Sequence, residues 1–315
     1  MSFENIIDIA DLDLIYLSYD EPAKEEFWLK IKNMCPWAKR VDGVKGSDAA
    51  HKAAGEISTT ERFVVVDGDN MPDENFFNLQ LDFTDKDPNY KLAQYRWRAI
   101  NAINGLRYGN GGISSWTKTY VANMHTHETS DGSDATAVDF CMDSSDNLYW
   151  AMWDSYSTTY PNYTPFQAWR AGFREGVKMV LDRGAKPTIE EFKDRVASRN
   201  LNNLTIWQNV GMDVENGSWA IYGARLGTYM TMLTDWDYRD VAWFDNFPEL
   251  WEKHRTNPIY YAEEIGEELQ DKLGLPICTL DATQSKFFKR HYNADKYNMG
   301  PLVKEMDVIR KIEGW

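Results

Sequence analysis

Cysteine is scarce in this chain, and the cysteines are not arranged in pairs. The three of them, Cys35, Cys141 and Cys278, are far apart in the sequence, and no Cys-x-x-Cys motif occurs. An odd number of separated cysteines argues against a disulfide framework and against a thiolate zinc site. We therefore expect three buried thiols.

Long apolar runs are missing too, and so is a basic segment at the start of the sequence. No run approaches the roughly 20 apolar residues that cross a bilayer. The first residues include acids instead of the basic and then apolar stretches of a secretory signal. These absences predict a cytoplasmic protein without a membrane partner.

Positive charge is in short supply. The chain has 34 Lys and Arg against 49 Asp and Glu, which gives a formal net charge of −15. A protein that holds DNA by its phosphates normally carries a basic surface. A nucleic-acid partner would therefore require a local cluster of basic side chains.

Apolar and aromatic residues are plentiful. Hydrophobic residues make up 43% of the 315 positions, which is enough for one elaborated domain or two domains with large cores. The 13 Trp and 17 Tyr can fill these cores, and such rings also stack on sugars and bases. We see neither repeats nor a low-complexity tail.

The most informative stretch is FVVVDGDN, from Phe63 to Asn70. Four consecutive apolar residues predict a strand that is buried on both faces of a sheet. Asp67 and Asp69 then lie at its carboxyl end, which is where open α/β sheets bind ligands, and Gly68 lets the backbone approach a ligand closely. Two carboxylates at this spacing suit a divalent cation that carries substrate phosphates. The alternative is an ordinary acidic turn.

The residues before this stretch alternate between strand and helix patterns. Leu12 to Tyr19 predicts a first strand, Asp20 is a plausible cap for an amphipathic helix, and Lys39 to Val44 predicts a second strand. A helix of small residues follows and leads into the Phe63 strand. This order predicts an α/β fold with a mostly parallel, doubly wound sheet.

The run VKGSDAAHKAAGEISTTERFVVVDGDN resembles the first half of a GT-A glycosyltransferase, of the large family typified by cellulose and chitin synthases. Gly46, His51, Lys52, Ala53 and Gly55 stand where that pattern has a glycine and a helix of small and basic residues. The resemblance covers about residues 12 to 70 and implies a GT-A fold, Rossmann-like, with its sheet flanked by helices. It implies Mn²⁺ or Mg²⁺ at Asp67 and Asp69. It also implies that a nucleotide-sugar donor contacts Ser18, Tyr19 and Asp20 through its base and ribose, and Lys45 and Lys52 through its diphosphate.

A glycine-rich segment, NGLRYGNGGISSW, spans residues 104 to 116. In GT-A enzymes a glycine-containing loop and strand near this position cradle the donor sugar, which would involve Gly111 and Gly112. Gly-Asn-Gly-Gly is also a good turn, and the segment lacks the spacing and the Lys-Ser/Thr pair of a phosphate loop. Between the Asp-x-Asp motif and this segment, the polar stretch from Met71 to Asn89 predicts an irregular loop.

No Lys or Arg occurs from Thr119 to Trp169, where several acids and two histidines lie. Asp139 follows a short apolar strand and is our candidate for the general base that deprotonates an acceptor hydroxyl; Asp143 is the competing candidate. His127, in MHTHE, is the preferred functional histidine over His125, and an ordinary loop histidine is the alternative.

Thr164 begins a capping box, Thr-Pro-Phe-Gln, which predicts a helix that runs to about Asp182. Arg170, Arg174 and Lys178 recur every four residues on one face of this helix. Such a face can bind a phosphate-bearing acceptor, although it is more often only solvated. We place a nucleotide-sugar-binding core at residues 1–160 and a helical, aromatic-rich acceptor region at 161–315.

The segments AHKAAGEISTT, YGNGG and FQAWRAGFREGVKM resemble glycosyltransferases of large T4-like phages. That resemblance implies transfer of arabinose or glucose from a UDP-sugar to 5-hydroxymethylcytosine in phage DNA, in the host cytoplasm. A saccharide or protein acceptor is an alternative that suits the negative charge better. A nucleotidyltransferase should carry a glycine-rich Arg-Lys loop where this chain has Asp20-Glu21-Pro22, and a noncatalytic phage interaction protein remains the third alternative.

Overall fold

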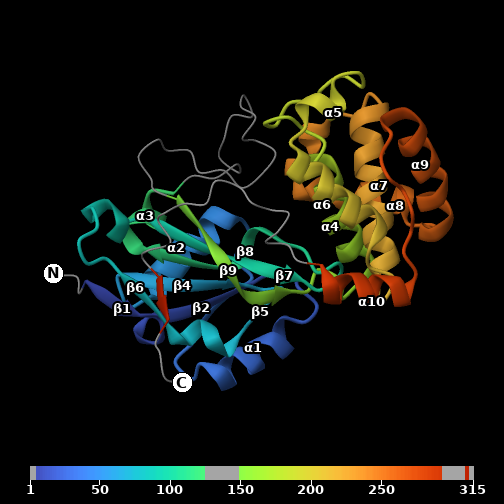
Figure 1. Cartoon of the computed structure of the whole chain (residues 1–315). Coiled ribbons are helices and arrows are strands. Elements are labelled where there is room, and N and C mark those ends of the chain that lie inside the picture. The colour runs from blue at the N-terminus through green and yellow to red at the C-terminus, as the bar shows by residue number, and fades with distance from the viewer. Residues whose placement is uncertain (1–4, 125–148, 293–308, 312–315) are drawn as a thin grey trace.

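The computed structural model describes residues 5–124, 149–292 and 309–311. Its main feature is a seven-stranded sheet with the order β3-β2-β4-β8-β7-β9-β5, next to a group of helices (Figure 1). The strands are β2 (Asp13–Ser18), β3 (Lys39–Asp42), β4 (Arg62–Asp67), β5 (Asn70–Pro72), β7 (Gln94–Asn101), β8 (Arg107–Thr117) and β9 (Tyr149–Thr159). A small second sheet joins β1 (Ile6–Asp8), β6 (Leu79–Asp82) and β10 (Ile309–Lys311).

The α/β class is as expected, but the large sheet is mixed. β2 runs parallel to β3 and to β4, as the alternating pattern predicts. Beyond β4 the direction changes, because β8 is antiparallel to both β4 and β7, while β9 is parallel to β7 and antiparallel to β5. The short turn between β7 and β8, closed by a hydrogen bond from Asn101 N–H to Leu106 O, leaves no room for a helical crossover. Three of the six neighbouring strand pairs are parallel, β3–β2, β2–β4 and β7–β9, so the sheet is mixed and the prediction of a mostly parallel sheet is not confirmed.

Helices cover both faces of the parallel strands, and this explains the uninterrupted apolar runs. Leu14, Tyr16, Val64 and Val66 share one core with α1 (Lys24–Met34). The alternate residues of the same two strands share a second core with α2 (Ser47–Ile57) and α3 (Lys118–Ala122); they are Ile15, Leu17, Phe63 and Val65. Each strand is thus buried on both sides.

Helices follow β9 in the chain and lie beside the sheet (Figure 1). They are α4 (Pro165–Lys178), α5 (Phe192–Arg195), α6 (Ser198–Asn209), α7 (Gly217–Leu233), α8 (Phe247–His254), α9 (Pro258–Leu273) and α10 (Ala282–His291). In the described parts of the chain, no helix has the length and apolarity to span a membrane.

The contact between α4 and α7 is made by backbone at four glycines. A Cβ at Gly172 would lie 2.0 Å from Ala220 O, and one at Gly223 would lie 2.1 Å from Trp169 O. Gly176 and Gly227 repeat this relationship one turn further along. The two Gly-x-x-x-Gly spacings were visible in the sequence and predict such close contact, although we did not single them out.

Several local predictions need correction. Asp20 is not a helix cap: α1 begins at Lys24, after Ala23, and has no side-chain cap. Thr164 does cap α4, since its side chain accepts a hydrogen bond from Gln167 N–H, but the helix ends at Lys178. Cys35 is buried as expected, whereas Cys278 is exposed.

The segment expected to be an irregular loop contains regular structure, and the glycine-rich segment, expected to be a loop and strand or a turn, is mostly strand. The polar segment 71–89 holds β5, β6 and two short 3₁₀ helices, η2 (Glu74–Asn78) and η3 (Pro88–Lys91), because its few apolar residues alternate as in a strand and enter the core. The glycine-rich segment lies largely in β8, where pairing with β4 and β7 decides its conformation.

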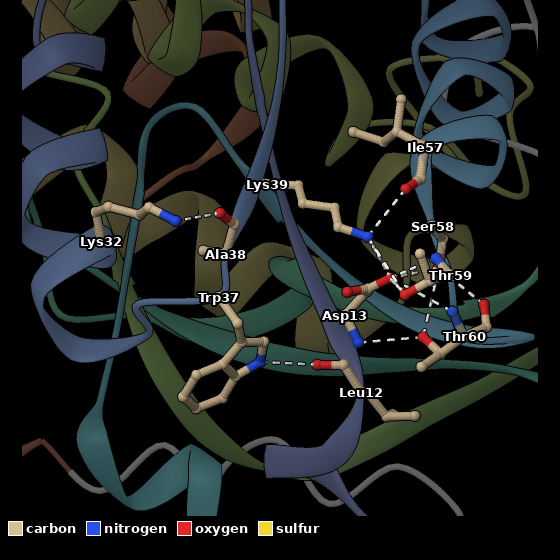
Figure 2. A network of polar contacts seen from close by, with 10 residues as sticks. All are labelled: Leu12, Asp13, Lys32, Trp37, Ala38, Lys39, Ile57, Ser58, Thr59 and Thr60. Atoms are coloured by element: carbon tan, nitrogen blue, oxygen red, sulfur yellow. Dashed lines mark hydrogen bonds and ion pairs between the residues drawn. The ribbon is translucent and has the colours of Figure 1, made fainter.

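A buried carboxylate ties together the amino ends of the parallel strands. The Oδ2 of Asp13 accepts hydrogen bonds from Lys39 Nζ at 2.8 Å, Thr59 N–H at 2.5 Å and Thr59 Oγ1 at 2.8 Å (Figure 2). Burial raises the pKa of this carboxyl, but the Lys39 and Thr59 hydrogen bonds outweigh it and lower the pKa to about 2. One charged group thus joins β2, β3 and the turn from α2 to β4.

Candidate active site

The Asp-x-Asp motif lies at the opposite, carboxyl end of the parallel strands. Asp67 is the last residue of β4, and the chain then passes through Gly68 and Asp69 to Asn70, the first residue of β5. This is the sheet edge at which the sequence predicts a ligand.

The side chain of Asp69 is held by its neighbours. Its Oδ1 accepts a hydrogen bond from Asn70 Nδ2 at 2.8 Å, and its Oδ2 accepts one from Thr159 Oγ1 at 3.0 Å. Tyr160 N–H donates to Asp69 O at 2.8 Å. These neutral donors fix the direction of the carboxylate and leave part of each oxygen available to a cation.

Asp67 lacks such hydrogen-bond donors among the described residues. Its side chain is exposed and makes no hydrogen bond within the part of the chain that the structure describes. Surrounding protein nevertheless desolvates the carboxyl and raises its pKa to about 7, against the opposing charge of Arg96, while the nearby Asp69 and Glu21 raise it further. A carboxylate that is costly to keep charged, and that has no internal partner, is suited to an external cation.

Glu21 belongs to this site, and our sequence analysis did not assign it. Its carboxylate fills the space beside Gly68, where a Cβ would lie 2.4 Å from Glu21 Cδ, and it accepts a hydrogen bond from Tyr19 N–H at 2.7 Å. Burial, and also the charges of Asp69 and Asp20, raise the pKa of Glu21. The Tyr16 hydroxyl donates a hydrogen bond to Gly68 O at 2.7 Å and so fixes the backbone of the Asp67–Asp69 loop. Gly68 therefore supplies space for a carboxylate, and its φ is not in the left-handed region.

Arg170 of α4 lies near this acidic edge, and Arg174 follows it one turn later in the helix. Burial and the charge of Arg174 lower the pKa of Arg170, while the carboxylates of Asp20, Asp69 and Glu21 oppose that shift. Arg170 is therefore near the Asp-x-Asp loop, although about 100 positions separate them. Neither arginine forms an ion pair or hydrogen bond with another described residue, and both guanidinium groups lie on the ring of Phe244.

Lys178 does not join Arg170 and Arg174. Its Nζ lies 2.6 Å from Glu175 Oε1, and both side chains are largely buried. The regular spacing of three basic residues thus predicted a common face, but the carboxylate three residues before Lys178 neutralises the third charge.

The two lysines assigned to the diphosphate have different surroundings. Lys45 Nζ lies 3.1 Å from Asp245 Oδ2, in η6 (Phe244–Asn246), so it forms an exposed ion pair with the helical region. Lys52, on α2, is half-buried and forms no ion pair within the described ranges. To bind a diphosphate, either lysine side chain would have to reach it from the position described, and Lys45 would also have to leave its ion pair with Asp245.

The residues assigned to the nucleotide and the sugar lie around the same edge. Ser18 donates to Asp42 Oδ1 at 2.7 Å and accepts from Arg40 Nε, so its hydroxyl is already engaged in the β2–β3 edge. Tyr19 and Asp20 are exposed directly after β2. Gly112 makes room for the side chain of Asn70, since a Cβ would lie 2.0 Å from Asn70 Nδ2.

Four of the sequence-based assignments are not described at side-chain level. Gly111 is in β8, next to Gly112, but its surroundings are not described. His127, Asp139 and Asp143 lie outside the described residues.

The described residues alone do not complete a metal shell. Within residues 5–124, 149–292 and 309–311, no group of three His, Cys, Asp or Glu side chains is arranged to hold a metal ion. Asp67 and Asp69 do fit the smaller set that Mg²⁺ takes in phosphate chemistry, namely one or two carboxylates with water and substrate phosphates. The carboxylates and the nearby guanidinium group of Arg170 together suit a ligand that carries both a cation and an anion.

Comparison with known proteins gives little more. No protein-family model matches the chain, and no curated protein matches it. A similar solved structure is that of a glycosyltransferase involved in the glycosylation of the major capsid of PBCV-1, with 16% sequence identity and a TM-score of 0.23. The match covers 35% of this chain and 62% of that protein. A TM-score this low does not establish a common fold.

Proposed function

We propose that this protein is a glycosyltransferase that moves a sugar from a UDP-sugar to a hydroxyl acceptor with the help of Mn²⁺ or Mg²⁺. The observation that carries the proposal is the Asp67-Gly68-Asp69 loop at the carboxyl end of β4, with Arg170 beside it. The resemblance of residues 12 to 70 to GT-A enzymes supports the same reading.

In this proposal Asp67 and Asp69 hold the cation, which, when bound, neutralises charge on the departing diphosphate. Arg170 contacts the diphosphate directly, because it interacts electrostatically with Asp69 and Glu21 and has no hydrogen-bond or ion-pair partner among the described residues. This departs from the sequence analysis, which placed Arg170 with the acceptor. Tyr19 and Asp20 remain accessible to the base and ribose.

The transfer itself needs a base. The bond from the sugar's anomeric carbon to the diphosphate oxygen breaks, the bond to the acceptor oxygen forms, and a carboxylate takes the acceptor's hydroxyl proton. Asp139 is the base we propose, with Asp143 as the competing candidate and His127 facing the acceptor or the metal.

The acceptor we propose to test first is 5-hydroxymethylcytosine in DNA, with a saccharide as the comparison. Enzymes that act on a base take it out of the stack. The net charge of −15 opposes DNA binding, and Lys178 and Lys289 are each paired with a carboxylate.

A thermal-shift experiment tests the proposal. The full chain is heated with UDP, UDP-glucose, UDP-arabinose, GDP-mannose or ATP, each with Mn²⁺ or with EDTA. A ligand that binds only the folded state raises the melting temperature by mass action. We expect a shift with UDP compounds that requires Mn²⁺ and is lost in Asp69→Asn but kept in Asp11→Asn, a change at an exposed carboxylate elsewhere. No shift with any nucleotide would contradict the proposal.

A further inference from the structure

Phe244 lies against two side chains of like charge. Its ring centroid is 5.4 Å from Arg170 Cζ and 4.6 Å from Arg174 Cζ. The two arginines are one helical turn apart on α4, so one aromatic ring spans both guanidinium groups. The negative face of such a ring attracts cations and offsets part of their mutual repulsion.

Arg170 also lies over the Phe166 ring, 5.3 Å from its centroid, and neither arginine has a hydrogen-bond or ion-pair partner among the described residues. Arg174 Nε is buried and makes no hydrogen bond there. A buried donor without a partner is destabilising, and the chain has an excess of acids that could have been paired with these arginines. An unpaired, adjacent pair of guanidinium groups is the arrangement that binds an external anion with several oxygens.

The Phe244 ring is itself held in place. It packs edge-on against Phe247 with centroids 5.7 Å apart. Phe247 is buried and contacts Trp169 and Phe173 from α4. Residues 244–247 thus reach from the buried side of α4 to its arginines.

We propose that Phe244 is a positioning residue, whose ring holds Arg170 and Arg174 together so that they bind one diphosphate group as a unit, even without a metal ion. The identity of the anion as the donor's diphosphate rests on the proposed function. The role of the Phe244 ring does not rest on the proposed function, because inorganic pyrophosphate can test it directly.

Isothermal titration of the full chain with inorganic pyrophosphate in EDTA tests the proposal. We expect measurable binding by the wild type and a loss of about fivefold in affinity for Phe244→Leu, which corresponds to about 1 kcal/mol for the lost cation–ring contacts. Phe244→Tyr keeps the ring and should restore wild-type affinity. Trp243→Leu is the matched control, because Trp243 is the preceding residue, is 52% exposed and makes no ring contact within the described residues.

A double-mutant comparison separates positioning from a general effect on the fold. In an Arg170→Gln, Arg174→Gln background, Phe244→Leu should have no further effect on pyrophosphate binding. Absence of wild-type binding overturns the proposal, as does an equal loss in Phe244→Leu and Trp243→Leu, or a loss in Phe244→Leu that persists without the arginines. None of these results tests metal-dependent UDP binding. The thermal-shift experiment therefore decides on the proposed function independently of the role of Phe244.

Discussion

The carboxylate of Glu21 occupies the space that a side chain at Gly68 would fill. These residues are at the ends of two neighbouring parallel strands, and a Cβ on Gly68 would come within 2.4 Å of Glu21 Cδ. The Asp-x-Asp loop therefore contains a glycine because a third carboxylate packs on it.

Gly68→Ala should displace Glu21 from the loop. We expect a loss of about 1 kcal/mol in the free energy of unfolding, because Tyr19 N–H also loses its acceptor. Denaturant unfolding measures this. In a Glu21→Ala background the space is free, so the same substitution should have almost no effect; an equal loss in both backgrounds would show that Gly68 is needed for another reason.

Asp67→Asn should change how stability depends on pH. The folded-state pKa of Asp67 is about 7, above the ordinary value of 3.8, so the folded state binds this proton more tightly than the unfolded state does. This group's contribution to wild-type stability therefore falls as pH rises from about 4 to about 7.

Asp67→Asn should not show this loss of stability with rising pH. We expect its melting temperature in EDTA to equal the wild-type value near pH 4 and to exceed it at pH 8 by about 1 to 2 °C, a small value because exposure screens the charge. Melting curves between pH 4 and 8.5 check this, with Asp11→Asn as the control. A difference that does not vary with pH would refute the assignment.

Asp13→Asn should change the pH dependence of stability in the opposite direction. The folded-state pKa is about 2, below the ordinary value, so the charged form contributes stability that is present above about pH 4 and is lost as pH falls toward 2. We expect a loss of about 2 kcal/mol at pH 7. Urea unfolding at pH 7 and pH 3 should show the deficit shrinking at the lower pH, whereas Glu26→Gln, at an exposed helix position, should have little effect at either pH.

Gly172→Leu should separate α4 from α7. The new side chain would meet the backbone of Ala220, which cannot move without shifting α7, so we expect a loss of about 3 kcal/mol or failure to fold. Gly172→Ala provides the milder case, and Gln270→Ala, at an exposed position of α9, provides the control. Circular dichroism during thermal melting measures all three. Wild-type stability in Gly172→Ala would mean that the helices can separate without loss.

Local patterns predicted part of the local structure. The apolar runs of β2 and β4 specified buried strands, and Thr164 with Gln167 specified the start of α4, because these features depend on neighbouring residues. The antiparallel pairing of β7 with β8 was not predictable in the same way, since it depends on the short turn after Asn101.

In the candidate site, too, the features set by neighbouring residues were predictable and those set by distant contacts were not. Asp67 and Asp69 follow directly from the end of an apolar strand. The approach of Arg170 does not, because it depends on how α4 packs against α7 and beside the sheet, and this involves contacts between residues far apart in sequence. Lys178 could have been excluded, since Glu175 is one turn away and pairs with it.

The two ends of the parallel strands respond to acid in different pH ranges. Asp13, at the amino ends, stays charged until the pH is close to 2, while Asp67, at the carboxyl ends, takes up a proton near pH 7. Mild acidification therefore removes a negative charge from the ligand edge while the opposite edge keeps the strands together. If Asp67 and Asp69 hold a cation as we propose, the affinity for that cation should fall as the pH is lowered from about 7 to 4, while Asp13 stays charged, and should return at neutral pH.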